Sequence, residues 1–414
     1  MKEEYVRALI SSGEGTGIEF KRDDVAPEKI AKKISAEKIA KTIVAMANRQ
    51  GGFILLGIDD RGNIDGLKRA KPEEWVMEIS REKVKPSIIV DYYEIQIEDL
   101  KVGIIKVPLG IDKPYYLEEK DRKTYYVRAG STNREATREE LRRIYQASGV
   151  LHYDECGLLT SSPDDLDYSR LSKYFLESRR IKLSGLDKEE TLRILINTGI
   201  LSEEEGKRVC TVGGILLFGR EPARILPSTG AIFAAFDGTK ITDNILDRKQ
   251  IEQTLPENVQ SLVQLIYTNL PVPAKIEGLY RENFYPIPEK VIREAIVNAF
   301  LHRDYTINGA KVMVFLFSDR LEIKSPGRPP NTMTIERMKA MVSVPRNSML
   351  FQFMYDYNYI EMLGRGIPMI FSEMKRLGVE PEIRIEGEET ILSIPLAKKN
   401  VTLYSSEVQN SLQI

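Results

Sequence analysis

The sequence predicts an α+β protein of several domains, on the strength of its length, its alternating patterns and its composition. The chain has 414 residues, and at about 150 residues per domain this suggests two or three domains. Helix-like and strand-like patterns alternate along it without internal repeats. Hydrophobic residues make up 42% and charged residues 29%, which is an ordinary globular composition. We expect the chain to divide into 1–149, 150–284, 285–397 and a polar tail at 398–414.

The first segment, 1–149, has the pattern of an α+β domain with a mainly antiparallel sheet. Residues 28–49 carry apolar side chains at helical spacing, and Gln50-Gly51-Gly52 is a helix stop. The later elements follow from the same criteria. They are a buried strand at 52–60, a helix at 72–82, two strands within 92–108 joined at Asp99, a strand with its exit loop at 124–137, and a helix at 138–146.

The remaining segments also mix helices and strands. In 150–284 we expect capped helices at 161–180 and 187–201, then apolar strands at 212–219 and 230–238. This spacing is also compatible with a winged helix-turn-helix, although no basic recognition helix is visible. From 285 the pattern of helices with a hairpin at 310–327 and a last strand pair predicts an α/β sandwich.

Charge and composition exclude several classes of protein. Lys and Arg number 60 and Asp and Glu 61, for a net charge of -1, so this is not a fully basic chromatin-type protein. The sequence has no apolar run long enough to span a membrane, and its acidic, polar start does not resemble a signal peptide. We expect a cytoplasmic protein. Cys156 and Cys210 allow one disulfide at most, and His152 and His302 lie too far apart in sequence for a histidine-based zinc site to be expected.

A first group of candidate catalytic residues consists of Glu14, Glu19, Lys21 and Asp59. Glu19 and Lys21 are two apart, so on an extended segment their side chains face the same side. Asp59 ends an apolar strand. Carboxylates that converge beside a lysine can hold Mg²⁺ or Mn²⁺ for phosphodiester cleavage. The alternative is a Glu-Lys salt bridge and a turn aspartate, and spacing alone favours that alternative.

Three blocks of the first segment resemble a known domain. They are GEGTGIEFKRD, IAKTIVAMANRQGGFILLGIDDRGNIDGL and YYVRAGSTNREAT, and together they are similar to the Schlafen AlbA-type domain, the DNA-binding domain of many prokaryotic regulators. In eukaryotic Schlafen proteins, related domains form a nuclease that cleaves structured RNA with two glutamates and an aspartate. The resemblance implies that Glu14, Glu19 and Asp59 (or its neighbour Asp60) occupy the matching positions.

Basic residues of this segment favour a nucleic-acid partner, DNA or RNA, because phosphate contacts need a local positive field. The alternative is a solvated helix face, since Glu37 can pair with Lys41 at i, i+4. The candidate phosphate contacts are Lys21, Arg22, Lys29, Lys32, Lys33, Lys38, Lys41, Arg49, Arg128, Ser131, Asn133 and Arg134.

A second candidate group is Glu294, Asn298 and His302, which lie at i, i+4 and i+8 on one predicted helix. A polar stripe on a mostly apolar helix needs a ligand, a metal or a partner to satisfy it. The spacing fits a carboxylate that orients water and an amide that binds Mg²⁺ on nucleotide phosphates. An exposed polar face is the alternative. Gly364 and Gly366 precede a helix whose N-terminus suits phosphate.

Four blocks of the third segment also resemble a known domain. They are REAIVNAFLHRDY, LEIKSPGRPP, SVPRNSMLFQF and IEMLGRGI, and together they are similar to the GHKL-type ATPase domain of the RecG-like C-terminal family of regulators. The resemblance implies ATP and Mg²⁺ as cofactors, Glu294 as general base and Asn298 as metal ligand. One block departs from the family, because Ser325 stands where an acidic residue reads the adenine amine. The nucleotide-binding residues that the resemblance implies are Asn298, His302, Arg303, Asp304, Gly327, Arg346, Asn347, Gly364, Arg365 and Gly366.

Three functions follow from these features. The first is a DNA-binding transcriptional regulator switched by ATP-dependent dimerisation, which the GHKL resemblance implies. The second is a metal-dependent endonuclease that acts on RNA or single-stranded DNA and is gated by ATP. The third is a non-catalytic oligomeric scaffold with a degenerate ATPase fold. A homodimer is the default assembly.

Overall fold

A computed structural model describes residues 2–23, 29–119, 122–149, 151–271, 274–277, 280–283, 285–329, 333–340, 344–360 and 365–398. Of the predicted tail at 398–414, residues 399–414 lie outside the described residues. The contacts divide the chain into two compact units, Met1–Leu151 and His152–Ile414. The structure is a mixed α+β fold, as the sequence predicts. It does not separate 150–284 from 285–397, because both segments contribute strands to one sheet.

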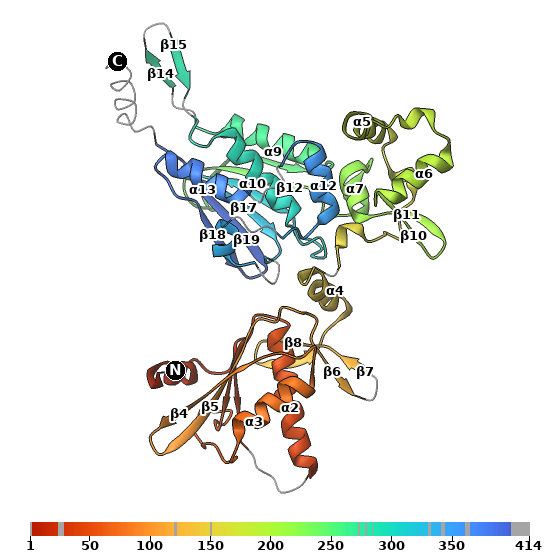
Figure 1. The fold of residues 1–414 in the computed structure, drawn as a ribbon. Helices are drawn as coiled ribbons and strands as arrows, with labels where there is room; N and C mark the ends of the chain where they lie inside the picture. Colours follow the sequence, from red (N-terminus) through yellow and green to blue (C-terminus); the bar gives the residue numbers. More distant parts are fainter. Residues whose placement is uncertain are drawn as a thin grey trace, which may run out of the picture. The chain divides into compact units, whose positions relative to one another are not determined.

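The first unit is built on a four-stranded sheet in the order β1-β2-β5-β4. These strands are β1 (Ile18–Lys21), β2 (Gly52–Leu56), β5 (Leu100–Val107) and β4 (Asp91–Ile97). Two of the three pairings are antiparallel, whereas β1 pairs with β2 in parallel. The parallel pair arises because α2 (Lys29–Ala47) connects β1 to β2 as a crossover. Figure 1 shows this unit with α2 and α3 (Pro72–Glu82) beside the strands.

The two faces of this sheet bury different side chains. On one face Phe20 packs with Val6 of α1 (Glu3–Ser12), Leu55 and Ile104. On the other face Ile54 and Ile105 pack with apolar residues of α2. Side chains alternate along a strand, and Glu19 pairs with Ile54 in the register. Glu19 therefore points to the face that α2 covers, and there a carboxylate needs partners.

Segment 124–137 forms a hairpin, so the predicted exit loop is in fact a second strand. β8 (Tyr126–Ala129) pairs with β9 (Thr132–Glu135) through a turn in which Gly130 has φ +62. A positive φ is sterically easy for glycine. The Asn133 Nδ2 atom donates to the Thr42 Oγ1 atom of α2 at 2.9 Å. The hairpin is therefore fixed beside α2.

Two other features belong to the first unit. Helix α4 (Arg138–Ala147) follows the hairpin in sequence. A small separate sheet consists of β3 (Val84–Lys85), β6 (Tyr116–Glu119) and β7 (Arg122–Thr124).

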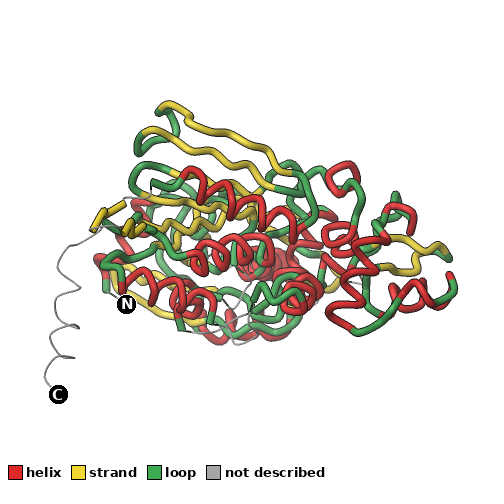
Figure 2. The backbone as a smooth tube through the Cα atoms, turned by 90° about the horizontal axis from the view of Figure 1, so that it is seen from above, coloured by secondary structure: helices red, strands yellow, loops and turns green. Residues whose placement is uncertain are grey.

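The second unit contains a six-stranded sheet in the order β13-β12-β16-β17-β19-β18. The strands are β12 (Ala231–Asp237), β13 (Asn244–Ile251), β16 (Val312–Leu316), β17 (Arg320–Pro326), β18 (Glu382–Glu386) and β19 (Glu389–Pro395). β12 runs parallel to β16, and the other pairings are antiparallel. The helices α9 (Leu255–Asn269), α10 (Glu289–Leu301) and α13 (Gly366–Arg376) lie on the sheet (Figures 1 and 2). The result is the predicted α/β sandwich.

The run at 212–219, predicted to be a strand, is a helix, α7 (Val212–Phe218). The Thr211 hydroxyl caps it by accepting from the Gly214 backbone N–H at 2.9 Å. All seven residues of α7 are buried, so the run has no alternation that would distinguish a strand from a core helix. A Cβ on Gly214 would lie 2.2 Å from the Ile200 carbonyl oxygen, so glycine allows this helix to approach the neighbouring backbone.

Along the sequence, two helices and a hairpin follow one another after the first unit and before the strands of the six-stranded sheet. They are α5 (Tyr168–Arg179), α6 (Lys188–Asn197) and the hairpin of β10 (Leu201–Glu204) with β11 (Lys207–Cys210). This is the element order of a winged helix-turn-helix, but the first turn of α6 carries Glu189 and Glu190. Acidic residues there would repel phosphates.

This unit also contains the short helices α8 (Pro222–Ile225) and α11 (Ile335–Lys339), helix α12 (Ser348–Asp356) and the hairpin of β14 (Ala274–Glu277) with β15 (Tyr280–Asn283).

Within the described part of the chain, none of the helices combines the length and the hydropathy that a membrane span needs.

Candidate functional site

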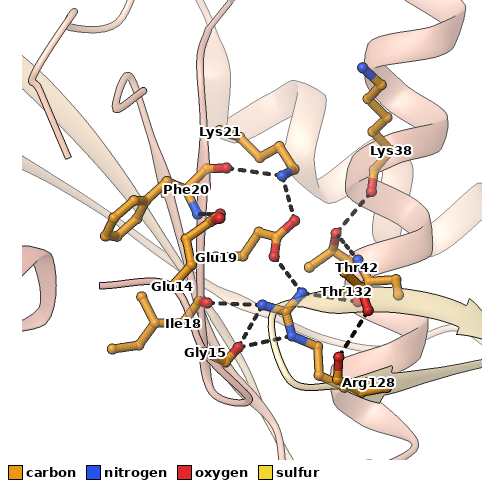
Figure 3. Close-up of polar contacts among 12 residues, drawn as sticks. Glu14, Gly15, Ile18, Glu19, Phe20, Lys21, Lys38, Thr42, Arg128 and Thr132 are labelled. Atoms are coloured by element: carbon orange, nitrogen blue, oxygen red, sulfur yellow. Dashed lines mark hydrogen bonds and ion pairs between the residues drawn. The ribbon is translucent and has the colours of Figure 1, made fainter. Parts of the chain in front are cut away.

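Glu19, a candidate metal ligand, is engaged inside the first unit. Its carboxylate is buried and forms ion pairs with Lys21 and Arg128 (Figure 3). Arg128 lies on β8 and is itself buried, with 2% of its surface exposed. Its guanidinium also donates to the Gly15 carbonyl at 2.6 Å, to the Ile18 carbonyl at 2.9 Å and to Asn133 Oδ1 at 3.0 Å. This network joins β1 to the β8–β9 hairpin.

Glu14 and Asp59 are also occupied by local hydrogen bonds. Glu14 Oε1 accepts from the Phe20 backbone N–H at 2.8 Å. Asp59 accepts from the backbone N–H groups of Arg61 and Asn63, at 2.9 and 2.8 Å, and so closes the turn after β2. Hydrogen bonds from Asn63, then from Arg61 and Arg22, lower the pKa of Asp59 to about 2. Asp59 is therefore a turn aspartate in this structure.

The three carboxylates do not converge in the described structure. In the described residues, His, Cys, Asp and Glu side chains form one group of three with ligand atoms close enough for an ion, and that group is His152, Asp154 and Glu155. It contains none of Glu14, Glu19 and Asp59. The salt-bridge alternative describes Glu19 and Lys21 better than the metal-site hypothesis does.

The predicted phosphate contacts have different environments. Arg128 is enclosed and its donors are bonded internally, so its predicted contact with phosphate conflicts with this structure. Asn133 bridges Arg128 and Thr42. Arg134 is exposed and pairs with Glu140 through two hydrogen bonds of 2.7 Å.

Other predicted phosphate contacts remain at the surface. Lys38 is exposed on α2, and Ser131 is exposed in the hairpin turn. The Lys41 ammonium lies 4.6 Å from the centroid of the Tyr126 ring. Arg22 is half-exposed and pairs with Asp59 and Asp65, and Arg49 donates to the Arg128 carbonyl at 2.6 Å. Lys29, Lys32 and Lys33 belong to α2, but their side chains lie outside the described residues.

A pocket of the second unit contains the other candidate group. Glu294, Asn298 and His302 of α10 and its C-cap line it, together with Ser325 and Gly366. Most of the remaining wall is apolar. The apolar lining residues are Ala295, Ala299, Ile323, Pro329, Met333, Met338, Val344, Phe351, Ile360, Ile367, Ile383 and Leu392. An apolar pocket with a few convergent polar groups is typical of a small-molecule site.

Glu294, Asn298 and Gly366 are in direct contact at one side of the pocket. The Asn298 Nδ2 atom donates to Glu294 Oε1 at 2.9 Å. A Cβ on Gly366 would lie 1.9 Å from Glu294 Oε1 and 3.2 Å from Asn298 Nδ2. Only glycine allows the N-terminus of α13 to approach these side chains so closely. Because Nδ2 faces Glu294, the amide oxygen of Asn298 points elsewhere and can serve as a cation ligand.

His302 is held as a neutral imidazole. Burial, and to a lesser extent the charge of Arg346, lower the pKa of His302 to about 4. At neutral pH the ring therefore offers one donor and one acceptor to whatever enters the pocket.

Four of the predicted nucleotide-binding residues do not line the pocket and instead bond to neighbouring parts of the chain. Arg303 is buried and donates to the carbonyls of Asp304, Ile307 and Ala310. Arg346 forms an ion pair with Asp304 at 3.1 Å, and Asn347 donates to the carbonyls of Leu301 and Arg303 at 2.8 and 2.9 Å. These contacts fix the chain after α10.

The other two predicted glycines, Gly327 and Gly364, and Arg365 differ from Gly366. Gly327 has φ +119, and a Cβ there would lie 2.5 Å from an Arg346 nitrogen, so the turn requires glycine. Arg365 is exposed at the N-cap of α13 and is not a lining residue of the pocket. Gly364 lies outside the described residues.

Comparison with protein families finds a match in each unit. Residues 14–137 match the family described as "Schlafen, AlbA_2", and residues 309–394 match the family described as "Putative ATP-dependent DNA helicase recG C-terminal". The chain carries a Schlafen AlbA_2 domain followed by a RecG C-terminal ATPase-type domain. Both predicted resemblances are confirmed. The chain is thus a nucleic-acid-associated, ATPase-like protein.

Similar proteins of known structure also exist. A protein from Corynebacterium diphtheriae is 21% identical, with a TM-score of 0.47, over 95% of this chain and 80% of that chain. The N-terminal domain of a RecG-related protein from Nitrosomonas europaea is 21% identical, with a TM-score of 0.22, over 31% of this chain and 92% of that chain. No curated protein matches the sequence.

Helix α10 lies before residue 309, where the match to the ATPase-type family begins, and it reaches the same pocket by packing on the sheet.

Some pocket residues were not predicted from the sequence. Thr390 of β19 and Arg328 also line the pocket. The Thr390 hydroxyl donates to the Gly327 carbonyl at 2.7 Å. No local pattern marks Thr390, because its place depends on the pairing of β19 with β17.

Proposed function

We propose that this protein binds nucleic acid through its first unit and ATP with Mg²⁺ through its second, and that ATP-dependent dimerisation switches it as a DNA-binding transcriptional regulator. The contact of Glu294, Asn298 and Gly366 at the side of an otherwise apolar pocket carries the proposal. Such a site can bury a base against apolar side chains and present polar groups to phosphates.

Adenine recognition in this proposal does not need the missing acidic residue. The Ser325 hydroxyl donates to the Ala299 carbonyl at 2.6 Å. A hydroxyl has one donor and two acceptor lone pairs. With its proton so committed, Ser325 Oγ is an acceptor at the pocket wall, where it would accept from the amine of adenine. Guanine has a carbonyl oxygen at that position, so this acceptor would favour ATP over GTP.

Hydrolysis would use two side chains of α10. Glu294 is the general base that orients the attacking water, and Asn298 supplies an amide oxygen to Mg²⁺. When bound, the metal would neutralise charge on the phosphates. The hydrogen bond from Asn298 fixes the Glu294 carboxylate in position, and the N-terminus of α13 at Gly366 would favour the phosphate charge.

The nucleic-acid surface would be the exposed side of α2 and the adjoining hairpin turn. We name it the α2–hairpin surface, with Lys38, Lys41, Ser131 and Arg134 as its members. The bond between Asn133 and Thr42 keeps the hairpin beside α2 (Figure 3 shows Thr42, Lys38 and Arg128). Contacts to phosphate from such residues give affinity that depends steeply on salt and weakly on sequence.

Titration calorimetry of the full chain with ATP and Mg²⁺ tests the nucleotide site. We expect one ATP per chain and at least a tenfold loss of affinity in Asn298→Ala. The matched control is Asn244→Ala, an exposed asparagine at the start of β13, which should bind as the wild type does. Light scattering with and without ATP then tests dimerisation. No ATP binding by the wild type would support the scaffold alternative instead.

Labelled tRNA, single-stranded DNA and duplex DNA, with Mn²⁺ and with or without ATP, test the first unit. We expect binding without cleavage, with an affinity that Lys38→Ala lowers and with a salt slope reduced by about 1. The control is Lys101→Ala, an exposed lysine on β5. Cleavage that disappears in a folded Glu19→Gln variant would replace this proposal with the nuclease.

A further inference from the structure

We infer that His152, Asp154 and Glu155 form a binding site for one zinc-class divalent metal ion in the second unit. Each residue offers a ligand atom, and the three atoms lie within 4.8 Å of one another. The three residues follow one another along a short 3-10 turn, Tyr153–Glu155, and its N-cap. The inference is independent of nucleotide binding, because none of these residues lines the pocket.

Two buried polar atoms of this cluster have no partner among the described residues. Asp154 is completely buried, and its Oδ1 atom has no hydrogen-bond partner in the described part of the chain. Within the same residues, the buried Nδ1 atom of His152 has none either. Buried polar groups are almost always satisfied, so unpartnered atoms on two residues of one cluster are unusual. A cation bound by the cluster would satisfy such atoms.

The surrounding contacts orient the carboxylates and leave ligand atoms open. The other oxygen of Asp154, Oδ2, accepts from the Leu350 backbone N–H at 3.0 Å. Glu155 Oε1 accepts from the Ser348 hydroxyl at 2.8 Å. Such hydrogen bonds from neighbouring groups are what orient carboxylate ligands in metal sites. Asp154 is held by one oxygen and can offer the other.

The donor set determines the class of metal. One imidazole nitrogen with two carboxylate oxygens suits Zn²⁺ in a site with three protein ligands and water in the fourth position. Mg²⁺ and Ca²⁺ prefer oxygen ligands alone. A bound ion would tie the start of the second unit to the N-terminus of α12, where both carboxylate partners, Ser348 and Leu350, lie.

The test uses the full chain, stripped with EDTA, dialysed and titrated with Zn²⁺ without nucleotide. We expect one equivalent of Zn²⁺ per chain and at least a tenfold loss of affinity in both Glu155→Gln and His152→Ala. Glu155→Gln is the more informative variant because Glu155 is exposed and a glutamine can still accept from Ser348. The matched control is Glu177→Gln, an exposed glutamate of α5, which should bind Zn²⁺ with unchanged affinity.

Two further measurements keep the result specific. Co²⁺ in place of Zn²⁺ should give visible absorption bands in the wild type that vanish in His152→Ala. Glu14→Gln and Asn298→Ala should retain the equivalent of Zn²⁺, which separates this site from the two sites predicted from the sequence. Absence of Zn²⁺ binding by the wild type, or undiminished affinity in either cluster variant, would overturn the inference.

Discussion

Arg128→Ala tests whether Arg128 is a structural residue or a phosphate contact. The guanidinium has no exposed side-chain surface, pairs with Glu19 and donates to the carbonyls of Gly15 and Ile18. Removing one partner of a buried ion pair costs about 3–5 kcal/mol, because the other charge is left uncompensated. Lys21 still pairs with Glu19, so we expect a loss of about 3 kcal/mol, at the lower end of that range.

Trp75 provides the assay. It is the single tryptophan of the chain, lies in α3 of the first unit and packs partly buried against that unit's core. Its fluorescence during urea unfolding of the full chain therefore reports on the first unit. With a slope of about 2 kcal/mol per M, a loss of about 3 kcal/mol lowers the midpoint by about 1.5 M.

Arg134→Ala is the matched control for this prediction. Arg134 is exposed and pairs with Glu140 at the surface, so its removal should cost less than about 1 kcal/mol. If Arg128→Ala unfolded at the wild-type midpoint and bound nucleic acid more weakly, the structural role would be refuted and the phosphate contact supported.

Three further predictions concern the pocket of the second unit. Gly366→Ala should lower ATP affinity at least tenfold in calorimetry, because its Cβ would lie 1.9 Å from Glu294 Oε1. Gly185→Ala is the control and should bind ATP as the wild type does, because a Cβ there meets nothing within 4 Å. Equal ATP affinity in the two variants would contradict a close contact between Gly366 and Glu294. His302 should stay neutral down to about pH 4, so its NMR signals, separable because the chain has 2 histidines, should not titrate between pH 5 and 8. Since the unfolded chain protonates this histidine at about 6.5, His302 should contribute a loss of stability of at most about 1.4 kcal/mol per pH unit as pH falls from 6.5 toward 4. Burial raises the pKa of Asp154 in the same unit to about 6, which acts in the opposite direction, so calorimetry should compare the pH dependence of stability in the wild type and in His302→Gln. Equal pH dependence of the two would argue against a neutral, buried His302. Ser325→Ala should reduce the preference for ATP over GTP, whereas an unchanged ratio would remove Ser325 from base recognition.

Local patterns predicted much of the fold. The helix at 72–82 is α3 with the same bounds, and the strands on either side of Asp99 are β4 and β5. These elements show clear helical or alternating periodicity, which follows from the geometry of a single element. The run at 212–219 had no such signal, because every residue of α7 is buried and only the surroundings decide between helix and strand.

The sequence also identified the helix of the second site but not the roles of its neighbours. Glu294, Asn298 and His302 line the pocket as their spacing on one helix predicted. Arg303, Asp304, Arg346 and Asn347 were predicted beside them, yet they bond to the backbone or to one another and do not line the pocket. Whether a charged side chain faces a cavity or the protein interior depends on packing between elements, which spacing along one element does not encode.

The sequence by itself determined the two families, the periodic helices and strands, and which residue types were present for chemistry. Only the tertiary structure decided which of those residues meet. It paired Glu19 with Arg128 across the 109 residues that separate them in sequence, so a candidate metal ligand became part of a buried ion pair. It also placed His152 beside two carboxylates, although the distance from His152 to His302 in sequence had argued against zinc. The physical reason is that burial and long-range contacts set the partners of a charged group, and those partners set its chemistry.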